Sequence, residues 1–255
     1  MSVLSYLVSR ASDAVLGNEK ESINKSVSTL QSRLNAYFGD TLKSQFRFGS
    51  STRGTILPRS MDEHSDIDYM IVFKDDDSVP QTYLDRLKRF AEASYGRSEI
   101  YQSSPTIVLE LNHIKFDLVP AKTVWYGGYR IPDGSGGWMD TDPNDFNSKL
   151  EEKNKDNASL IKPTIRLAKY WNAENGYLFD SFSFEKWIVG LWYWNCTNQK
   201  DYFFSVIDKL SIENETTQWR KDKIARAKSI VDLVREYERQ GMPTTAELEI
   251  KKLIK

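Results

Sequence analysis

The chain has 255 residues, of which 40% are hydrophobic and 28% are charged, and its formal net charge is -1. This length suits one large globular domain or two smaller ones, and the near-neutral charge gives no overall attraction to long nucleic acid or to a membrane. One cysteine and two histidines exclude a disulfide within the chain and leave too few ligands for a structural zinc site. We therefore expect no zinc and no long nucleic-acid partner.

The N-terminal segment gives no targeting signal. Residues 1–10 lack the basic start, the long apolar run and the cleavage site of a signal peptide. No stretch of the sequence approaches the roughly 20 apolar residues of a membrane span. We expect a cytoplasmic protein that makes no membrane contact.

The first half of the chain predicts helices and strands in alternation. Apolar residues at helical spacing predict a helix from about residue 21 to residue 38, and Gly39 follows as a stop. A turn at Asn112-His113 joins two later strands, and Pro120 is expected to end the second of them. The other expected elements are a short strand at 44–48, a buried strand at 65–73, a helix after Pro80, and the two strands at 106–111 and 114–119.

The second half predicts only helices. Residues 123–147 are rich in Gly, Pro and Asp, so we expect irregular structure there and a domain transition near its end. The segment 184–196 is apolar nearly all round and should form a central helix. Gly241 is a candidate C-cap, and Thr244 with Glu247 fits a capping box. The expected helices are roughly 157–174, 183–197, 200–211, 217–240 and 244–254.

Three aspartates form the candidate catalytic set. Asp66 and Asp68 are two apart on a predicted strand, so both carboxylates project from one face, opposite an apolar set that begins at Ile67. Asp117 lies in a second apolar strand, where it suits a third carboxylate facing the same cation. Magnesium prefers oxygen ligands and shares them with substrate phosphates, and two such ions activate an attacking hydroxyl and stabilise a leaving oxygen.

A glycine–serine turn precedes the Asp-x-Asp strand. Gly49 allows the backbone to approach a phosphate closely, and the hydroxyl of Ser50 and nearby backbone N–H groups are suitable donors to it. Either motif alone is common as an ordinary turn or a solvated strand end. The combination is far more specific: a strand, Gly-Ser, a loop, Asp-x-Asp on a strand, and a later Asp within a strand.

The combined signature resembles the polymerase-β-like nucleotidyltransferase superfamily, and more narrowly the bacterial cGAS/DncV-like nucleotidyltransferases (CD-NTases). Several segments carry the resemblance and together span nearly the whole chain: 48–59, 65–73, 116–120, 138–143, 166–172, 181–185 and 225–254. The Gly-Ser and Asp motifs are specific for the superfamily, and the later segments point to the CD-NTase branch. The chain is shorter than many relatives and lacks the zinc ligands of the DNA-sensing animal relative.

The resemblance implies an α+β fold with a polymerase-β-like core, whose mixed sheet is flanked by helices, and a C-terminal helical domain. It implies domains at 1–145 and 146–255 in a bilobed arrangement with a central cleft. Asp66, Asp68 and Asp117 would bind Mg²⁺, for which Mn²⁺ could substitute. The triphosphate would contact Gly49 and Ser50, and further residues implied by the resemblance or by their chemistry are Lys169, Ser181 and Arg53, although Arg53 equally suits bracing of the loop and Ser181 a helix cap.

The implied activity is the joining of nucleoside triphosphates into a cyclic or short linear oligonucleotide second messenger, with release of pyrophosphate. Antiphage defence signalling through an effector that binds the product is the implied setting. Two alternatives stay open from the sequence. One is transfer of a nucleotide to another acceptor, such as a tRNA end, a small molecule or a protein. The other is a non-catalytic nucleotide-binding module, which three intact aspartates argue against.

Overall fold

The computed structural model describes residues 1–17, 19–74, 77–211 and 217–255, and these separate into two compact units. The sheet unit comprises Leu16–Arg59 and Glu63–Ser148. The helical unit comprises Met1–Val15, Ser60–Asp62 and Lys149–Lys255. The division after Ser148 lies close to the expected boundary at 145, but the first fifteen residues pack with the helical unit.

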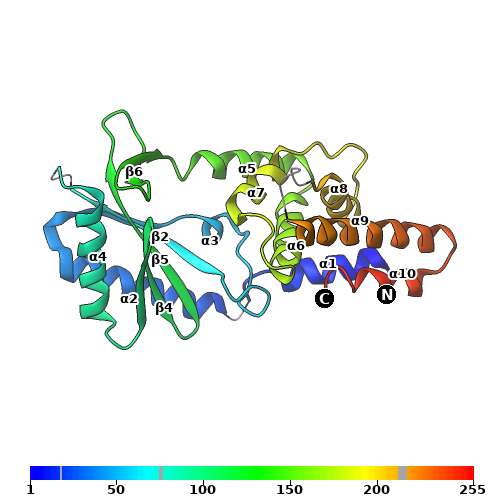
Figure 1. The fold of residues 1–255 in the computed structure, drawn as a ribbon, viewed down its shortest axis with the longest axis horizontal. Helices are drawn as coiled ribbons and strands as arrows, with labels where there is room; N and C mark the ends of the chain where they lie inside the picture. Colours follow the sequence, from blue (N-terminus) through cyan, green and yellow to red (C-terminus); the bar gives the residue numbers. More distant parts are fainter. Residues whose placement is uncertain (18, 75–76, 212–216) are drawn as a thin grey trace. The chain divides into compact units, whose positions relative to one another are not determined.

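The sheet unit is built on a mixed sheet in which only one pair of neighbouring strands is parallel. The strand order is β1-β2-β5-β4-β3, with β6 paired to β5 and β7 paired to β6. The parallel pair is β2 with β5, while the other pairs are antiparallel. The strands are β1 (Leu42–Arg47), β2 (Asp66–Phe73), β3 (Glu99–Ser103), β4 (Thr106–Leu111), β5 (Ile114–Thr123), β6 (Tyr129–Pro132) and β7 (Trp138–Thr141) (Figure 1).

Two helices pack on one face of this sheet and form the main core of the unit. They are α2 (Glu19–Phe38) and α4 (Pro80–Ser94). The alternation predicted for β2 is confirmed, because one set of its side chains joins this core and is at most 2% exposed. That set is Ile67, Tyr69, Ile71 and Phe73. The other face of β2 carries Asp66 and Asp68 at one end and a smaller apolar cluster further along.

The predicted end of β5 at Pro120 is wrong, since the strand continues to Thr123. Pro120 has no N–H to donate, so a central strand normally excludes it. Here the antiparallel pairing with β4 stops at Leu118 and the pairing with β6 begins at Lys122. Pro120 falls in the gap between these two partners and keeps its place opposite Ile71 in the parallel pair with β2.

The prediction of irregular structure over 123–147 is also wrong. This stretch contains the paired strands β6 and β7 and the first turn of α5 (Asp145–Asp156). These strands were not predicted from the sequence, because each is only four residues long and glycines separate the two. The same shortness and exposure hid β3, whose side chains are mostly exposed.

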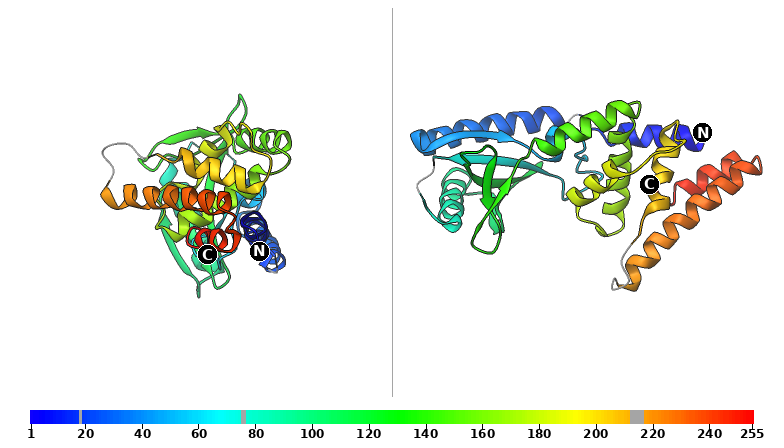
Figure 2. Two further views of the ribbon diagram at one scale, coloured as in Figure 1. Left: turned by 90° about the vertical axis from the view of Figure 1, so that its right-hand side faces the viewer. Right: turned by 90° about the horizontal axis from the view of Figure 1, so that it is seen from above.

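The helical unit contains α1 (Val3–Asp13), α6 (Ile161–Glu174), α7 (Ser181–Gly190), α8 (Gln199–Lys209), α9 (Gln218–Arg239) and α10 (Pro243–Ile250). Helix α1 packs against α6, α8 and α10, which explains why the N-terminal residues belong to this unit. Helices α9 and α10 form a hairpin, coloured orange and red in Figures 1 and 2. The helix predicted over 157–174 begins only at Ile161, after Ala158 and Ser159 adopt positive φ.

The predicted central helix over 183–197 is wrong in both length and place. Helix α7 ends at Gly190, and two tryptophans of the predicted helix, Trp192 and Trp194, are 83% and 86% exposed. Helix α6 is the buried one, with every residue from Thr164 to Asn172 buried. The sequence did not predict this burial, because Arg166 and Lys169 are charged and charged residues are usually exposed. Here their long side chains pack inside the unit.

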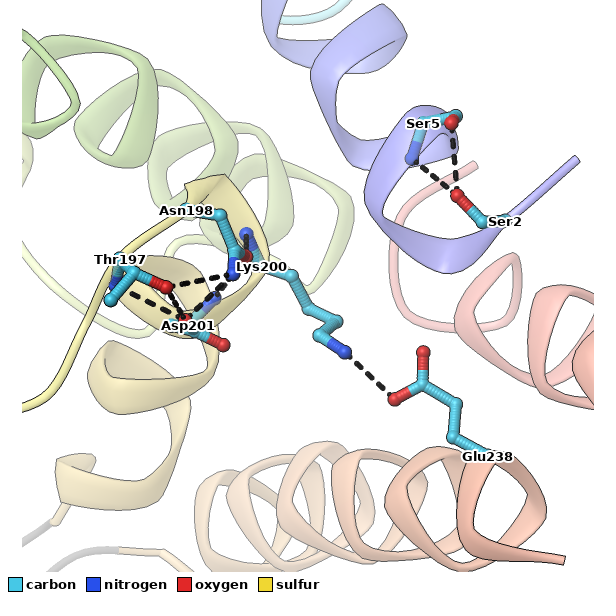
Figure 3. A network of polar contacts seen from close by, with 7 residues as sticks. All are labelled: Ser2, Ser5, Thr197, Asn198, Lys200, Asp201 and Glu238. Carbon is cyan, nitrogen blue, oxygen red and sulfur yellow. Dashed lines mark hydrogen bonds and ion pairs between the residues drawn. The ribbon is translucent and has the colours of Figure 1, made fainter. Parts of the chain in front are cut away.

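Figure 3 shows the polar contacts at the starts of α1 and α8 and one ion pair between α8 and α9. Asn198 caps α8 by accepting hydrogen bonds from the backbone N–H groups of Lys200 and Asp201, and Lys200 pairs with Glu238 on α9 at 2.8 Å. Ser2 caps α1 in the same way. The predicted capping box of α10 is wrong, because the helix starts with Pro243 and has no side-chain cap.

The predicted stop of α9 at Gly241 is confirmed. Gly241 has a φ of +71°, and the N–H of Met242 donates to the carbonyl of Tyr237 at 2.8 Å, the bond of a Schellman motif. Among the described residues, no helix is both long and apolar enough to cross a membrane.

Candidate active site

The two Asp-bearing strands lie side by side in a fixed register. Strands β2 and β5 lie next to each other in the sheet (Figure 1). They are parallel, with Asp68 opposite Asp117 and Asp66 opposite Lys115. Side chains alternate along a strand, so these four charged groups share one face of the sheet, and their apolar neighbours face the core. The prediction that Asp117 comes from a neighbouring strand is therefore confirmed by the pairing.

A lysine that the sequence analysis did not single out lies among these aspartates. The ammonium of Lys115 is 3.2 Å from Oδ2 of Asp66 and 3.6 Å from Oδ1 of Asp117. One cation within 4 Å of both carboxylates shows that Asp66 and Asp117 point toward a common space. The signal was present in the sequence, since Lys115 is two residues before Asp117 and alternation puts both on one face.

The cluster of Asp66, Asp117 and Lys115 is partly desolvated, and this changes the pKa values of Asp117 and Lys115. The side chains of Lys115, Asp117 and Asp66 are 19%, 20% and 29% exposed. Burial, with a smaller contribution from the charge of Asp66, raises the pKa of Asp117 to about 6. Burial by itself would lower the pKa of Lys115, but the charges of Asp66 and Asp117 together raise it above its ordinary value.

The donor set fits a hard divalent cation in its chemistry. Carboxylate oxygens are the ligands that Mg²⁺ prefers, and Oδ1 of Asp117 is buried without a hydrogen-bond donor. Within the described ranges, however, no three acidic, histidine or cysteine side chains already converge as a metal cage. The ammonium of Lys115 stands among the carboxylates instead, so the residues that would hold the metal are Asp66, Asp68 and Asp117 after a local adjustment.

Gly49 makes room for one of these carboxylates. It adopts a φ of +71°, which residues with a β-carbon rarely populate, and a β-carbon placed on it would lie 1.8 Å from Oδ2 of Asp68. The backbone N–H of Phe48 donates to the carbonyl of Asp68 at 3.0 Å, which ties the loop to β2. The Gly-Ser turn and the Asp-x-Asp strand are thus in direct contact.

Ser50 opens the short helix α3 (Ser50–Arg53) directly after this glycine. The carbonyl of Gly49 accepts hydrogen bonds from the backbone N–H and the hydroxyl of Thr52. The first N–H groups of a helix have no acceptor within it, so this turn presents donors next to the carboxylates. Arg53 is 6% exposed and stacks over the ring of Phe146 at 5.2 Å, a contact that favours bracing of the loop.

Lys169 and Ser181 belong to the helical unit. Lys169 is buried, and its ammonium donates to Glu185 on α7 at 3.0 Å, so it is not a solvated surface residue. Ser181 is exposed at the first position of α7, and the N-cap is its neighbour Asp180, which accepts from the N–H of Ser183 at 2.8 Å. The hydroxyl of Ser181 is therefore not the helix cap. Contact of either residue with a triphosphate stays a prediction.

Tyr177 is an aromatic residue whose ring could stack on a base. It has a φ of +56°, is 37% exposed, and donates its hydroxyl to Asp62 at 2.6 Å. Its ring is therefore not part of the core, although contact with a base stays a prediction. Glu185 is the buried partner of Lys169. From the sequence it stood out only as a member of the family-like segment 181–185.

A comparison with protein families gives a match over residues 1–154 to the Second Messenger Oligonucleotide or Dinucleotide Synthetase domain, abbreviated SMODS. The chain belongs to this family. The matched stretch contains all the candidate residues of the sheet unit, from Gly49 to Asp117. The SMODS assignment agrees with the resemblance to bacterial CD-NTases seen in the sequence.

Two curated relatives resemble part of this SMODS chain. A probable cyclic nucleotide synthase of Bacillus cereus (strain VD146) is 34% identical over 131 residues, which cover 47% of this chain and 40% of the relative. A cyclic AMP-AMP-AMP synthase of Acinetobacter sp. (strain ATCC 27244 / 9458) is 31% identical over 97 residues, 38% of this chain and 28% of the relative. The match spans less than half the length of either curated relative.

Solved structures share the fold over nearly the whole SMODS chain. The structure of Escherichia coli MS115-1 CdnC with ATP has a TM-score of 0.71 at 16% identity, covering 98% of this chain and 97% of that one. Vibrio cholerae DncV, a cyclic AMP-GMP synthase, has a TM-score of 0.70 at 9% identity, with coverage of 89% and 88%. At such identities the likeness confirms the α+β fold, with a mixed sheet flanked by helices.

Proposed function

We propose that this SMODS protein is a template-independent nucleotidyltransferase that joins nucleoside triphosphates into a cyclic or short linear oligonucleotide and releases pyrophosphate. The observation that carries the proposal is the register of β2 and β5. It places Asp66, Asp68 and Asp117 on one face, and Gly49 leaves the space that the carboxylate of Asp68 occupies. A carboxylate set beside a phosphate-accommodating turn suits phosphoryl transfer, which depends on positioning and charge neutralisation.

The site is proposed to use Mg²⁺, with Mn²⁺ as a substitute. When bound, the metal supplies charge neutralisation for the triphosphate and lowers the pKa of the attacking hydroxyl. Asp66, Asp68 and Asp117 would hold it. Asp117 is also the residue proposed to accept or orient the proton of the attacking ribose hydroxyl, alongside the metal.

The remaining contacts proposed for the triphosphate rest on the resemblance to the family. The turn at Gly49 and Ser50 would bind phosphate oxygens through N–H and hydroxyl donors. Lys169 and Ser181 would contact the outer phosphates. For Arg53, the stacking on Phe146 supports a role in holding the loop rather than in direct phosphate contact.

The proposed product class follows the names of the relatives, which are cyclic nucleotide synthases. The role proposed for the product is that of a second messenger in antiphage defence, bound by an effector of the same defence system. The ring size, the bases and the linkage are to be read from the product itself.

The test is the double variant Asp66→Ala/Asp68→Ala, assayed for pyrophosphate release from mixed nucleoside triphosphates with Mg²⁺. We expect release to disappear while the circular dichroism spectrum and unfolding transition stay cooperative. Asp85→Ala, which removes an exposed carboxylate from α4, is the matched control and should keep full activity. Activity in the double variant would remove the metal-site assignment.

A second measurement separates the proposal from transfer to another acceptor. The purified protein is incubated with labelled nucleoside triphosphates and no added acceptor, and the products are identified by mass spectrometry. Oligonucleotides formed from the triphosphates alone support second-messenger synthesis. Product that forms only when a tRNA, a small molecule or a protein is added would assign the chain to the alternative class.

A further inference from the structure

We propose that Lys115 is a built-in counter-ion of the carboxylate site, whose ammonium competes with the divalent metal for Asp66 and Asp117 and so sets the affinity of the site for metal. This inference rests on the proposed function, because it concerns the same carboxylates. It makes Lys115 a positioning residue rather than a metal ligand, since an ammonium has no lone pair to donate.

The position of Lys115 is fixed by the backbone of the sheet. Register places it directly opposite Asp66 and two residues before Asp117 on β5, on the carboxylate face. Its ammonium therefore reaches both aspartates, at 3.2 Å and 3.6 Å. The 3.6 Å separation from Oδ1 of Asp117 is too long for a hydrogen bond, and that buried oxygen has no hydrogen-bond donor among the residues that the structure describes. Lys115 thus neutralises Asp117 by charge without satisfying its oxygen.

The cluster needs a cation because it is partly buried. Three aspartates on adjacent strands repel one another, and the repulsion grows as solvent is removed. The side chains of Lys115 and Asp117 are only 19% and 20% exposed, and within the described residues the ammonium of Lys115 is the positive charge that lies within 4 Å of both Asp66 and Asp117. The fold therefore keeps the site partly neutralised before any metal arrives.

A divalent metal held by these carboxylates would compete with the ammonium for them. Magnesium draws carboxylate oxygens to about 2.1 Å, and its charge repels an ammonium held at the same carboxylates. Among the described residues the carboxylates are not yet gathered as a metal cage. On this proposal, the Lys115 side chain would leave Asp66 when metal binds, and the observed binding free energy would be reduced by the cost of breaking this pair.

The test measures Mn²⁺ binding to the nucleotide-free protein by electron paramagnetic resonance of the free ion, independently of catalysis. Lys115→Met and Lys115→Gln remove the charge and should lower the Kd for Mn²⁺ about tenfold, the effect of losing one partly buried ion pair. Lys115→Arg keeps the charge and should stay within about twofold of wild type. Lys43→Met, which removes an exposed lysine of β1 with the same change in net charge, is the matched control and should also leave the Kd unchanged.

A thermal unfolding measurement distinguishes competition from a merely structural ion pair. Competition predicts that Lys115→Met has a lower Tm than wild type in chelator. It also predicts that added Mn²⁺ raises the Tm of Lys115→Met by more than it raises the Tm of wild type. A purely structural pair predicts the same loss with and without Mn²⁺, which would overturn the proposal. If Lys115→Met does not fold in chelator, Lys115→Gln takes its place in both experiments.

The outcomes also separate this inference from the proposed function. The metal site stands if wild type binds Mn²⁺ and the variant Asp66→Ala/Asp68→Ala does not bind it. The counter-ion role is refuted if, in addition, Lys115→Met binds Mn²⁺ no more tightly than wild type. If neither wild type nor Lys115→Met binds Mn²⁺, the metal site itself fails, and the inference fails with it.

Discussion

The β-carbon that Gly49 lacks would lie 1.8 Å from Oδ2 of Asp68. The glycine of the Gly-Ser turn and the second aspartate of the Asp-x-Asp strand therefore occupy complementary space. This relationship joins two motifs that are nineteen residues apart in the sequence (49 to 68) into one site.

Gly49→Ala is expected to displace the Asp68 carboxylate and to strain the turn, because alanine also disfavours a φ of +71°. We expect nucleotidyl transfer to fall by about a hundredfold or more, since small misplacements of catalytic groups have effects of this size. Steady-state pyrophosphate release measures the loss. Gly54→Ala is the control: Gly54 has the same φ but a ψ of 27°, in the left-handed helical region, against −156° at Gly49, and a β-carbon added there would meet no atom within 4 Å. The control variant should therefore carry a smaller backbone strain and keep most activity.

Asp117→Asn is expected to change the pH dependence of folding in metal-free buffer. Burial raises the pKa of Asp117 in the folded state to about 6, above the ordinary value of 3.8, so the folded state binds its proton more tightly than the unfolded state. The contribution of Asp117 to the free energy of unfolding therefore declines as pH rises from about 4 to about 6, and the whole penalty is present above that range. Asparagine does not titrate and avoids the penalty.

Urea unfolding at pH 4.5 and pH 7.5 in chelator checks this expectation. The stability of Asp117→Asn relative to wild type should be higher at pH 7.5 than at pH 4.5, by at most roughly 2 kcal/mol, because part of the penalty is already present at pH 4.5. An equal difference at both pH values would show that the folded environment of Asp117 does not raise its pKa.

Removing either partner of the buried pair Lys169–Glu185 should destabilise the protein. Both residues are among the most buried charged side chains of the helical unit, and their ammonium and carboxylate lie 3.0 Å apart. Glu185→Gln or Lys169→Met should each cost about 3 kcal/mol, because each leaves a buried charge without this partner. The double variant Lys169→Met/Glu185→Gln should be less destabilised than the sum of the two single variants, which a double-mutant cycle from urea unfolding measures.

The same cycle tests the phosphate contact proposed for Lys169. If Lys169 binds the triphosphate, the double variant should show a raised KM for nucleoside triphosphate while its fold is intact. If the double variant is more stable than the single variants and has the KM of wild type, Lys169 serves only the packing of α6 against α7.

Gly241→Ala should destabilise the hairpin of α9 and α10. Gly241 follows α9 with a φ of +71°, and the Met242 N–H closes the Schellman bond to Tyr237. Alanine in this conformation costs about 1 kcal/mol. Urea unfolding should show that loss, and pyrophosphate release at a temperature well below the transition should be unchanged. An unaltered midpoint would mean that the turn does not contribute to stability.

The sequence by itself determined those features that depend on local alternation and local backbone chemistry. Period-two spacing put Asp66 and Asp68 on one face of β2 with Ile67 on the other, and a glycine was expected where a backbone must approach another group. The stop of α9 at Gly241 follows from the same kind of rule. These features are encoded within a few neighbouring residues, so no knowledge of distant contacts is needed to predict them.

Only the tertiary structure decided which distant residues meet. Lys115 reaches Asp66 because β2 and β5 pair in parallel with one register out of several possible, and that choice is made by the whole sheet. Lys169 is buried because Glu185 lies opposite it on α7, a contact across a helix boundary. Pairing partners of charged side chains depend on long-range packing, and local periodicity carries no information about them.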